Sequence, residues 1–222
     1  MAQVRTGAKD RPGAIAAPTR RPRRGLALLL ALAALAAACG SPPPLAGTDL
    51  GQTPAPDFTL TDQNGDALQL SALRGRPIAL TFLYTQCPDV CPLTADKLRR
   101  TADLLGSAAD QVAFVAVSVD PPHDDAAAAQ AFVAQHRLTG RLRYLVGTQA
   151  ELQPVWSAYY MYVAPSPSDD PAERAAANYA ARTATHTDAL FVIDRQGRER
   201  TLLRSDFEPE ALASTLKRLL GE

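Results

Sequence analysis

Two of the three cysteines in the chain, Cys87 and Cys91, stand four positions apart in the stretch TFLYTQCPDVCPLT. Redox motifs of the C-x-x-C type place their cysteines three apart, so this spacing is one residue longer. A zinc site needs two further ligands beside such a pair. Because the only other cysteine is Cys39, a four-sulfur site within one chain is excluded. The pair is compatible with a structural disulfide, a redox-active dithiol or a metal site.

The residues around the pair predict a strand, a loop and a helix. Ile78–Tyr84 is almost continuously apolar, as expected of a central strand buried on both faces. Leu93–Leu105 has apolar residues at helical spacing, and Pro92 suits the first helical position because its missing N–H is not needed there. A thiol at the start of this helix meets the positive end of the helix dipole, where cysteine pKa values fall to about 3.5–7.5. Two such thiolates facing one point select soft ions such as Cu(I).

The rest of the chain alternates between strand-like and helix-like segments. The stretch 56–73 predicts a β-hairpin that turns at Asn64-Gly65. The further expected strands are Val112–Asp120, Leu142–Val146 and Ala189–Asp194, and the further expected helices are Ala126–His136, Ala150–Tyr160 and Pro209–Leu220. Such alternation indicates an α/β fold, with a sheet covered by helices on both faces.

Residues 1–39 are interpreted as an export signal. A basic start ending in RRPRR precedes the apolar run LALLLALAALAAA, which is shorter than the roughly 20 residues of a membrane span and typical of a secretory signal. Cys39 comes next and precedes Gly40-Ser41, which resembles a bacterial lipoprotein signal with a lipidated cysteine. The alternative is a plain signal peptide or an uncleaved anchor. Residues 40–54 are predicted to form a flexible tether, and residues 55–222 one domain.

The charge of the chain limits its partners. Residues 1–39 contain seven of the 23 Lys and Arg and one of the 23 Asp and Glu, which leaves 16 basic and 22 acidic residues and a net charge of −6. This balance argues against nucleic acid, which requires a basic face. Membrane attachment is therefore expected only through a lipid on Cys39. Export places the cysteine pair where a disulfide can persist, so we expect an extracytoplasmic protein anchored to the outer face of the bacterial cell membrane.

Three histidines could supply a further metal ligand. His123 follows the second buried strand in the stretch DPPHDD, His136 ends a predicted surface helix, and His186 directly precedes the strand segment at Ala189–Asp194. In doubly wound sheets the loops at one edge gather around the first strand-to-helix turn, so the loop with His186 can reach the cysteines. From position alone, however, a structural or solvated role is the simpler interpretation for each histidine. Asp120 is expected to cap a helix or to be solvated in its loop, and the alternative is that it orders the site or contacts a partner.

Four stretches together resemble the Sco/SenC family of copper-binding, thioredoxin-fold proteins, namely PDFTLTDQNG, LSALRGRPIALTFLYTQCPDVCPLT, VSVDPPHDD and HTDALFVIDRQG. The resemblance implies a thioredoxin-like fold with a central mixed sheet and an N-terminal β-hairpin extension. It also implies one copper ion, Cu(I) or Cu(II), bound by Cys87, Cys91 and His186. One departure is Thr185, which stands where the family often has Asp, while Asp188 follows two residues after the histidine.

The same resemblance implies what the protein acts on. Members of the family deliver copper to the dinuclear copper site of cytochrome c oxidase, or reduce the thiols of that site. The expected partners are therefore the copper-site subunit of that oxidase and, in second place, a thioredoxin-like reductant or another copper chaperone.

Two rival interpretations use the same cysteines. A thiol–disulfide oxidoreductase would cycle Cys87 and Cys91 as a redox-active pair, but such enzymes keep a proline before the strand that faces the pair, where this chain has His186-Thr187. A peroxiredoxin shares the opening PDFTL pattern, but its reactive cysteine follows a proline that Leu83–Gln86 lacks. The sequence therefore favours a metallochaperone over an enzyme and leaves a reductase activity open.

Overall fold

The structure is a computed structural model that describes residues 44–163 and 188–222. The predicted lipidation site Cys39 and the predicted ligand His186 lie outside the described residues, as do the rest of the predicted export signal and residues 40–43 of the predicted tether. The strands in chain order are β1 (Thr48–Pro54), β2 (Thr59–Asp62), β3 (Ala67–Gln69), β4 (Ile78–Leu83), β5 (Ala113–Ser118), β6 (Leu142–Val146), β7 (Leu190–Ile193) and β8 (Arg198–Leu203). The α-helices are α2 (Val90–Leu105), α3 (Ala126–Gln135), α4 (Gln149–Ala158) and α6 (Pro209–Leu220), and η1 (Leu70–Leu73) and η2 (Gly106–Gln111) are 3₁₀ helices.

The eight described strands form one mixed sheet in the order β1-β8-β7-β4-β5-β6-β2-β3. Strands β4, β5 and β6 run parallel, whereas β7 runs antiparallel to β4. Every residue of β4 and β5 is buried, which explains why both segments are almost wholly apolar. The end of β4, where the cysteines follow, therefore lies at the centre of one edge of the sheet.

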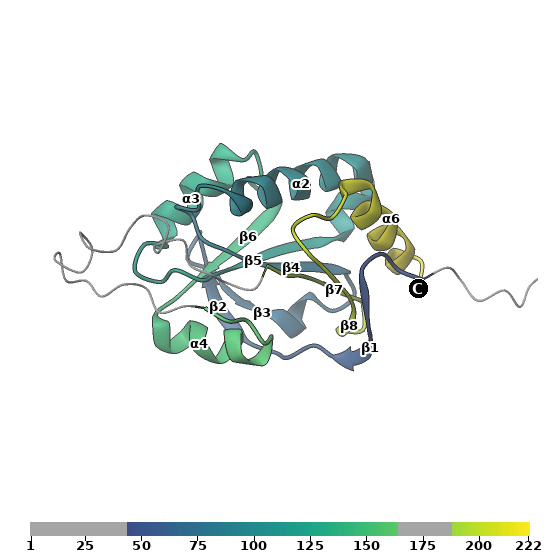
Figure 1. The fold of residues 1–222 in the computed structure, drawn as a ribbon, viewed down its shortest axis with the longest axis horizontal. Helices are drawn as coiled ribbons and strands as arrows, with labels where there is room; N and C mark the ends of the chain where they lie inside the picture. The colour runs from purple at the N-terminus through teal and green to yellow at the C-terminus, as the bar shows by residue number, and fades with distance from the viewer. Residues whose placement is uncertain (1–43, 164–187) are drawn as a thin grey trace, which may run out of the picture. The chain divides into compact units, whose positions relative to one another are not determined.

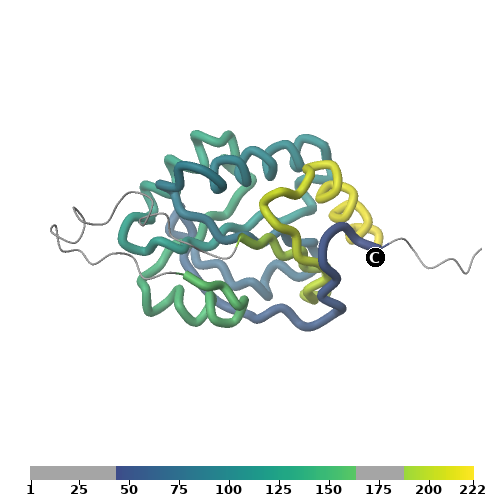
Figure 2. The backbone as a smooth tube through the Cα atoms, in the orientation of Figure 1, coloured from purple at the N-terminus to yellow at the C-terminus, as the bar shows by residue number. Residues whose placement is uncertain are grey.

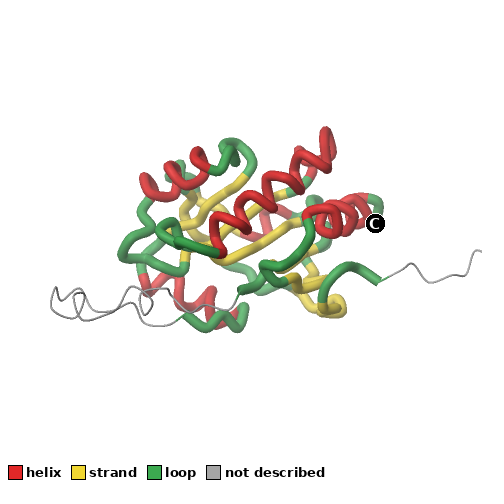
Figure 3. Tube along the Cα trace, turned by 45° about the horizontal axis from the view of Figure 1, so that its top comes forward, coloured by secondary structure: helices red, strands yellow, loops and turns green. Residues whose placement is uncertain are grey.

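Helices cover both faces of the sheet, as the sequence predicted. Figure 1 shows α2, α3 and α6 on one side of the strands and α4 on the other. The smooth trace and the view turned by 45° show α6 beside the long helix α2 (Figures 2 and 3), where Lys217 donates to the carbonyl of Leu104. The buried stripe of α2 includes Ala95, Leu98 and Ala102. The α/β, thioredoxin-like architecture predicted from the sequence is thus confirmed.

The predicted hairpin is also present, as β2 and β3. The buried carboxylate of Asp62 accepts the backbone N–H groups of Asn64 and Asp66 at 2.9 and 3.0 Å, and Gly65 has φ of +85°, a conformation that favours glycine. The side chain of Gln63 then joins the hairpin to β6, because it accepts from the N–H of Tyr144. The hairpin thereby extends the sheet beyond β6.

One boundary prediction is wrong. The sequence predicts a flexible tether up to residue 54, but residues 48–54 form β1, which pairs with β8 at the edge of the sheet. The hydroxyl of Thr201 donates to the carbonyls of Ala46 and Thr48, and Gly47 lies so close to β8 that a Cβ would sit 2.4 Å from the carbonyl oxygen of Leu202. Pro, Gly and Thr suit both a tether and an edge strand, so composition could not separate the two.

Candidate metal centre

The two cysteines lie where β4 passes into α2. Cys87 belongs to the loop after β4, and Cys91 is the second residue of α2, which begins at Val90. Cys87 is 7% exposed and Cys91 is fully buried. Pro92 falls two positions later than predicted, as the third residue of α2, where its missing N–H still costs no helical hydrogen bond. The strand-loop-helix unit expected from the sequence is therefore confirmed, with both sulfurs beneath the surface.

The sulfur of Cys87 faces the start of α2. The backbone N–H of Cys91 donates to Cys87 Sγ at 3.4 Å, and both cysteines are free thiols. The hydrogen bond between the two cysteine side chains lowers the pKa of Cys87 from its ordinary value of 9.0 to about 5, against the opposing effect of burial. Backbone N–H groups and the hydroxyl of Tyr84 add to this lowering of the pKa.

The pKa of Cys91 is shifted in the opposite direction. Its hydrogen bond to Cys87 and its burial raise the pKa of Cys91 far above the ordinary value. The pair therefore holds one thiolate, on Cys87, and one thiol, on Cys91, at neutral pH. The thiolate is the form that binds soft metals and attacks disulfides. The metal-free protein therefore has one reactive sulfur, on Cys87, whose thiolate is stabilised by a hydrogen bond from the thiol of Cys91.

This asymmetry predicts an unusual pH profile for alkylation of Cys87. With Cys39→Ser removing the third thiol, the rate with iodoacetamide is expected to be half-maximal near pH 5 and flat above about pH 6, because the thiolate is already complete. An ordinary thiol would instead reach its half-maximal rate only near about pH 8.5. Cys91→Ala, which removes the side-chain donor to the Cys87 sulfur, should move the midpoint to higher pH. A wild-type midpoint near 8 would contradict this assignment.

A buried carboxylate lies beneath the cysteine loop. Asp124 is 2% exposed and accepts hydrogen bonds from Thr85, Ser118 and Tyr144. Burial raises the pKa of Asp124, against the lowering effect of the bonds from Ser118 and Thr85. Sequence reasoning missed both Asp124 and Tyr84 as residues of this site. Nothing in the pattern DPPHDD separates Asp124 from its exposed neighbours, since only the fold brings it under the cysteines.

Two of the three histidines lie in the described part of the chain. The ring of His123 contacts the carboxylate of Asp120, with Nδ1 2.9 Å from Oδ2, which agrees with a structural role for His123. The cap of the following helix α3 is Asp125, however, and not Asp120. His136 ends α3 with its ring 4.4 Å from that of Phe132, and burial lowers the pKa of His136. His136 is therefore packed against the helix and less solvated than expected.

The third predicted ligand cannot be placed, because His186 lies outside the described residues. Within 44–163 and 188–222, no three His, Cys, Asp or Glu side chains are grouped so that they could hold a metal ion. The described chain resumes at Asp188, whose carboxylate accepts the N–H of Ser205. The next residue, Ala189, accepts from the hydroxyl of Thr81 on β4 at 3.1 Å. The chain thus enters β7 beside the half of β4 that leads to the cysteines.

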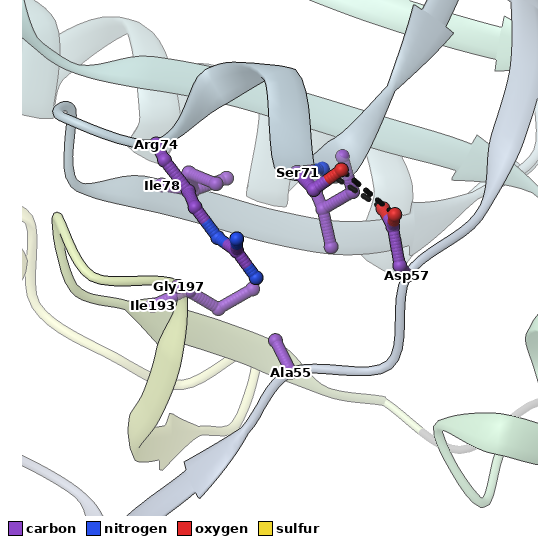
Figure 4. Close-up of a pocket in the computed structure, with 8 residues that line it drawn as sticks. Ala55, Asp57, Ser71, Arg74, Ile78, Ile193 and Gly197 are labelled. Carbon is purple, nitrogen blue, oxygen red and sulfur yellow. Dashed lines mark hydrogen bonds between the residues drawn. The ribbon is translucent and has the colours of Figure 1, made fainter.

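A hollow at the opposite end of β4 does not resemble a ligand site. It is lined by Asp57, Ser71, Arg74 and the first residue of β4, Ile78 (Figure 4). Its volume of about 20 Å³ has room for about one water molecule. Asp57 is occupied by the N–H and hydroxyl of Ser71, at 2.8 and 2.7 Å. The chemistry-bearing residues therefore gather at the cysteine end of the sheet.

Comparison with known proteins identifies relatives of this chain and its fold. The model of the family described as SCO1/SenC matches residues 47–221. The solved structure of Bradyrhizobium japonicum ScoI with copper bound is 33% identical, covers 76% of this chain and all of that chain, and has a TM-score of 0.64. The solution structure of apo Sco1 from Thermus thermophilus is 26% identical, covers 82% and 99% of the two chains, and has a TM-score of 0.65.

Curated relatives show the same similarity at lower coverage. The mitochondrial SCO2 homolog of Mus musculus is 30% identical over 147 residues, which are 65% of this chain and 56% of the mouse protein. The SCO2-like protein RC0895 of Rickettsia conorii is 24% identical over 161 residues, which are 72% of this chain and 74% of that protein. The matched part therefore spans between about half and three quarters of the length of these two relatives.

Proposed function

The chain belongs to the SCO1/SenC family, and on this basis we propose that it is a copper-binding chaperone of cytochrome c oxidase assembly. It delivers copper to the dinuclear copper site of the oxidase or reduces the thiols of that site. The observation that carries the proposal is the pair of buried, reduced cysteines at the start of α2, one of which faces a backbone N–H. The similarity to a copper-bound ScoI at 33% identity supports copper as the metal.

The chemistry of the two sulfurs fits a soft ion. Thiolates select Cu(I) over hard cations, and the low pKa of Cys87 keeps one thiolate ready at neutral pH. Cys91 must lose its proton when a metal takes both sulfurs, so binding releases a proton. Both thiols lie beneath the surface and would partly shield a bound ion from water, and the N–H of Cys91 would compensate part of the charge on the sulfur of Cys87.

His186 is proposed as the third ligand. What supports it is the entry of the described chain into β7 beside β4, two residues after His186 in the sequence. Imidazole is a suitable ligand for copper in either oxidation state. The carboxylate of Asp188 accepts the backbone N–H of Ser205 and is not needed as a copper ligand.

His186→Ala tests the proposal. We expect the variant to lose more than about 100-fold in copper affinity, because changing even an outer partner of a ligand costs about 10- to 100-fold. The affinity is measured by competition with a chromophoric Cu(I) chelator. His136→Ala is the matched control, since His136 packs on Phe132 at the end of α3, and it should keep the wild-type affinity. Undiminished affinity in His186→Ala would exclude the histidine as a ligand.

A second candidate function is thiol–disulfide exchange. The free thiols and the lowered pKa of Cys87 favour it, because a thiolate is the attacking species. The same His186→Ala variant separates the two functions. A dedicated reductase would keep its disulfide-reducing activity in this variant and would be inhibited by copper, whereas a chaperone would lose its metal site.

The proposed place of action is the outer face of the bacterial cell membrane. The export signal in residues 1–39 and the lipoprotein-like position of Cys39 support this proposal. Within the described ranges, 44–163 and 188–222, no helix is long and apolar enough to cross a membrane. The proposed partners are the copper-site subunit of the oxidase and a thioredoxin-like reductant or second copper chaperone.

A further inference from the structure

The loop that carries Cys87 is attached to the neighbouring loop of the sheet edge. At its start, the N–H of Val119, which follows β5, donates to the carbonyl of Leu83 at 3.0 Å. One residue further along, the turn from Tyr84 to Cys87 is closed by a bond from the N–H of Cys87 to the carbonyl of Tyr84 at 3.3 Å. Thr85 lies inside this turn, so whatever holds Thr85 also sets the position of Cys87.

The carboxylate of Asp124 holds Thr85 through both of its donors. Oδ1 accepts the backbone N–H of Thr85 at 2.8 Å and its hydroxyl at 2.7 Å. Asp124 is itself fixed, since its own N–H donates to the carbonyl of Asp120 at 2.9 Å. A hydrogen bond to a charged group contributes more than one between neutral groups, and this carboxylate is almost wholly removed from water.

The other oxygen of Asp124 has different partners. Oδ2 accepts the hydroxyl of Ser118 at 2.6 Å and that of Tyr144 at 3.0 Å, which belong to β5 and β6. The two oxygens therefore serve two separable purposes. Oδ2 accepts hydrogen bonds from the sheet and so holds Asp124 in place, and Oδ1 accepts hydrogen bonds from the cysteine loop.

We propose that Asp124 is a positioning residue for the cysteine pair, which it holds in place by accepting both the backbone N–H and the hydroxyl of Thr85. This role rests on the proposed copper-binding function and deepens it. Partners that orient the ligands of a metal are needed for affinity although they never touch the ion. Asp124 would orient Cys87 indirectly, through its hydrogen bonds to Thr85 in the cysteine loop.

The two oxygens offer a matched pair of variants in the full-length chain. Thr85→Val removes one hydroxyl donor from Oδ1, and Tyr144→Phe removes one hydroxyl donor from Oδ2. Hydrogen exchange of the Thr85 and Cys87 amides is measured in the metal-free protein, and Cu(I) affinity by chelator competition. Thr85→Val should speed exchange at both amides by about tenfold and weaken Cu(I) binding, whereas Tyr144→Phe should change both by less than about twofold.

Substitution of Asp124 itself shows how much of the Cu(I) affinity depends on its carboxylate. Asp124→Ala should weaken Cu(I) binding by about tenfold or more, and Asp124→Asn, whose side-chain oxygen can still accept from Thr85, should fall between it and wild type. If Asp124→Ala does not fold, the comparison of Thr85→Val with Tyr144→Phe still tests the proposal. Equal effects of Thr85→Val and Tyr144→Phe would overturn the proposal and leave Asp124 a purely structural residue. If the wild type failed to bind Cu(I), the proposed function would fall, while amide exchange in the metal-free protein would still test the positioning.

Discussion

Cys87→Ser is expected to abolish Cu(I) binding, from about one ion per chain to less than about 0.1. Serine keeps the shape of the side chain but replaces a soft thiolate by a hydroxyl that stays protonated. The remaining sulfur of Cys91 is fully buried, and burial still raises the pKa of its thiol. The substitution also leaves no second thiolate to share the ion. Copper is counted by metal analysis after the protein is loaded with Cu(I) and passed over a desalting column.

The third cysteine of the chain provides the control. Cys39→Ser removes a thiol that is predicted to carry a lipid, and it should leave the copper content at the wild-type value. Cys91→Ser should behave like Cys87→Ser, because two coordinated sulfurs are required. A Cys87→Ser protein that kept its full copper content would show that the metal binds elsewhere and would remove the main support of the proposed function.

Phe82→Ala is expected to lower the free energy of unfolding by about 3–5 kcal/mol. Phe82 lies on β4, is 1% exposed, and packs its ring against those of Tyr159 and Phe191 at centroid distances of 5.7 and 6.2 Å. The substitution leaves a cavity in a cluster that joins β4, β7 and the end of α4. The midpoint of urea unfolding, followed by circular dichroism, measures the change.

Leu104→Ala is the matched surface control. Leu104 lies on α2 and is 42% exposed, so its truncation should change the free energy of unfolding by no more than about 0.5 kcal/mol. If both variants unfolded at the wild-type urea concentration, the aromatic cluster would not be the core of the fold. Because β4 leads directly into the cysteine loop, Phe82→Ala should also weaken copper binding.

Much of this fold was predictable because its central strands are buried on both faces. Ile78–Tyr84 and Val112–Asp120 could hardly be other than inner strands, and β4 and β5 lie within them. The helices after them followed from apolar spacing, and the strand at Leu142–Val146 was placed with its observed bounds. Edge strand β1 was not predictable, since its residues are mostly exposed and held by pairing with β8.

The candidate site was predictable only in part, for a related reason. The spacing of Cys87 and Cys91 marks them directly in the sequence. Asp124 and Tyr84 act on these thiols through contacts that depend on the arrangement of β4, β5 and β6, and no local pattern distinguishes them. The aromatic residues at the end of α4 illustrate the same limit, because Tyr159 is buried whereas its neighbour Tyr160 is 90% exposed.

The unequal burial of the two sulfurs fixes an order of events for any exchange between this protein and another molecule. An incoming sulfur can meet Cys87, whereas Cys91 is shielded on every side. The Cys87 thiolate would therefore attack a disulfide of the partner, which forms a mixed disulfide and releases one partner thiolate. Cys91, once deprotonated, would then attack Cys87 Sγ, which closes a Cys87–Cys91 disulfide and releases the second partner sulfur as a thiolate. During transfer of a bound copper ion, the same asymmetry would make Cys87 the first sulfur to dissociate from the ion and Cys91 the last.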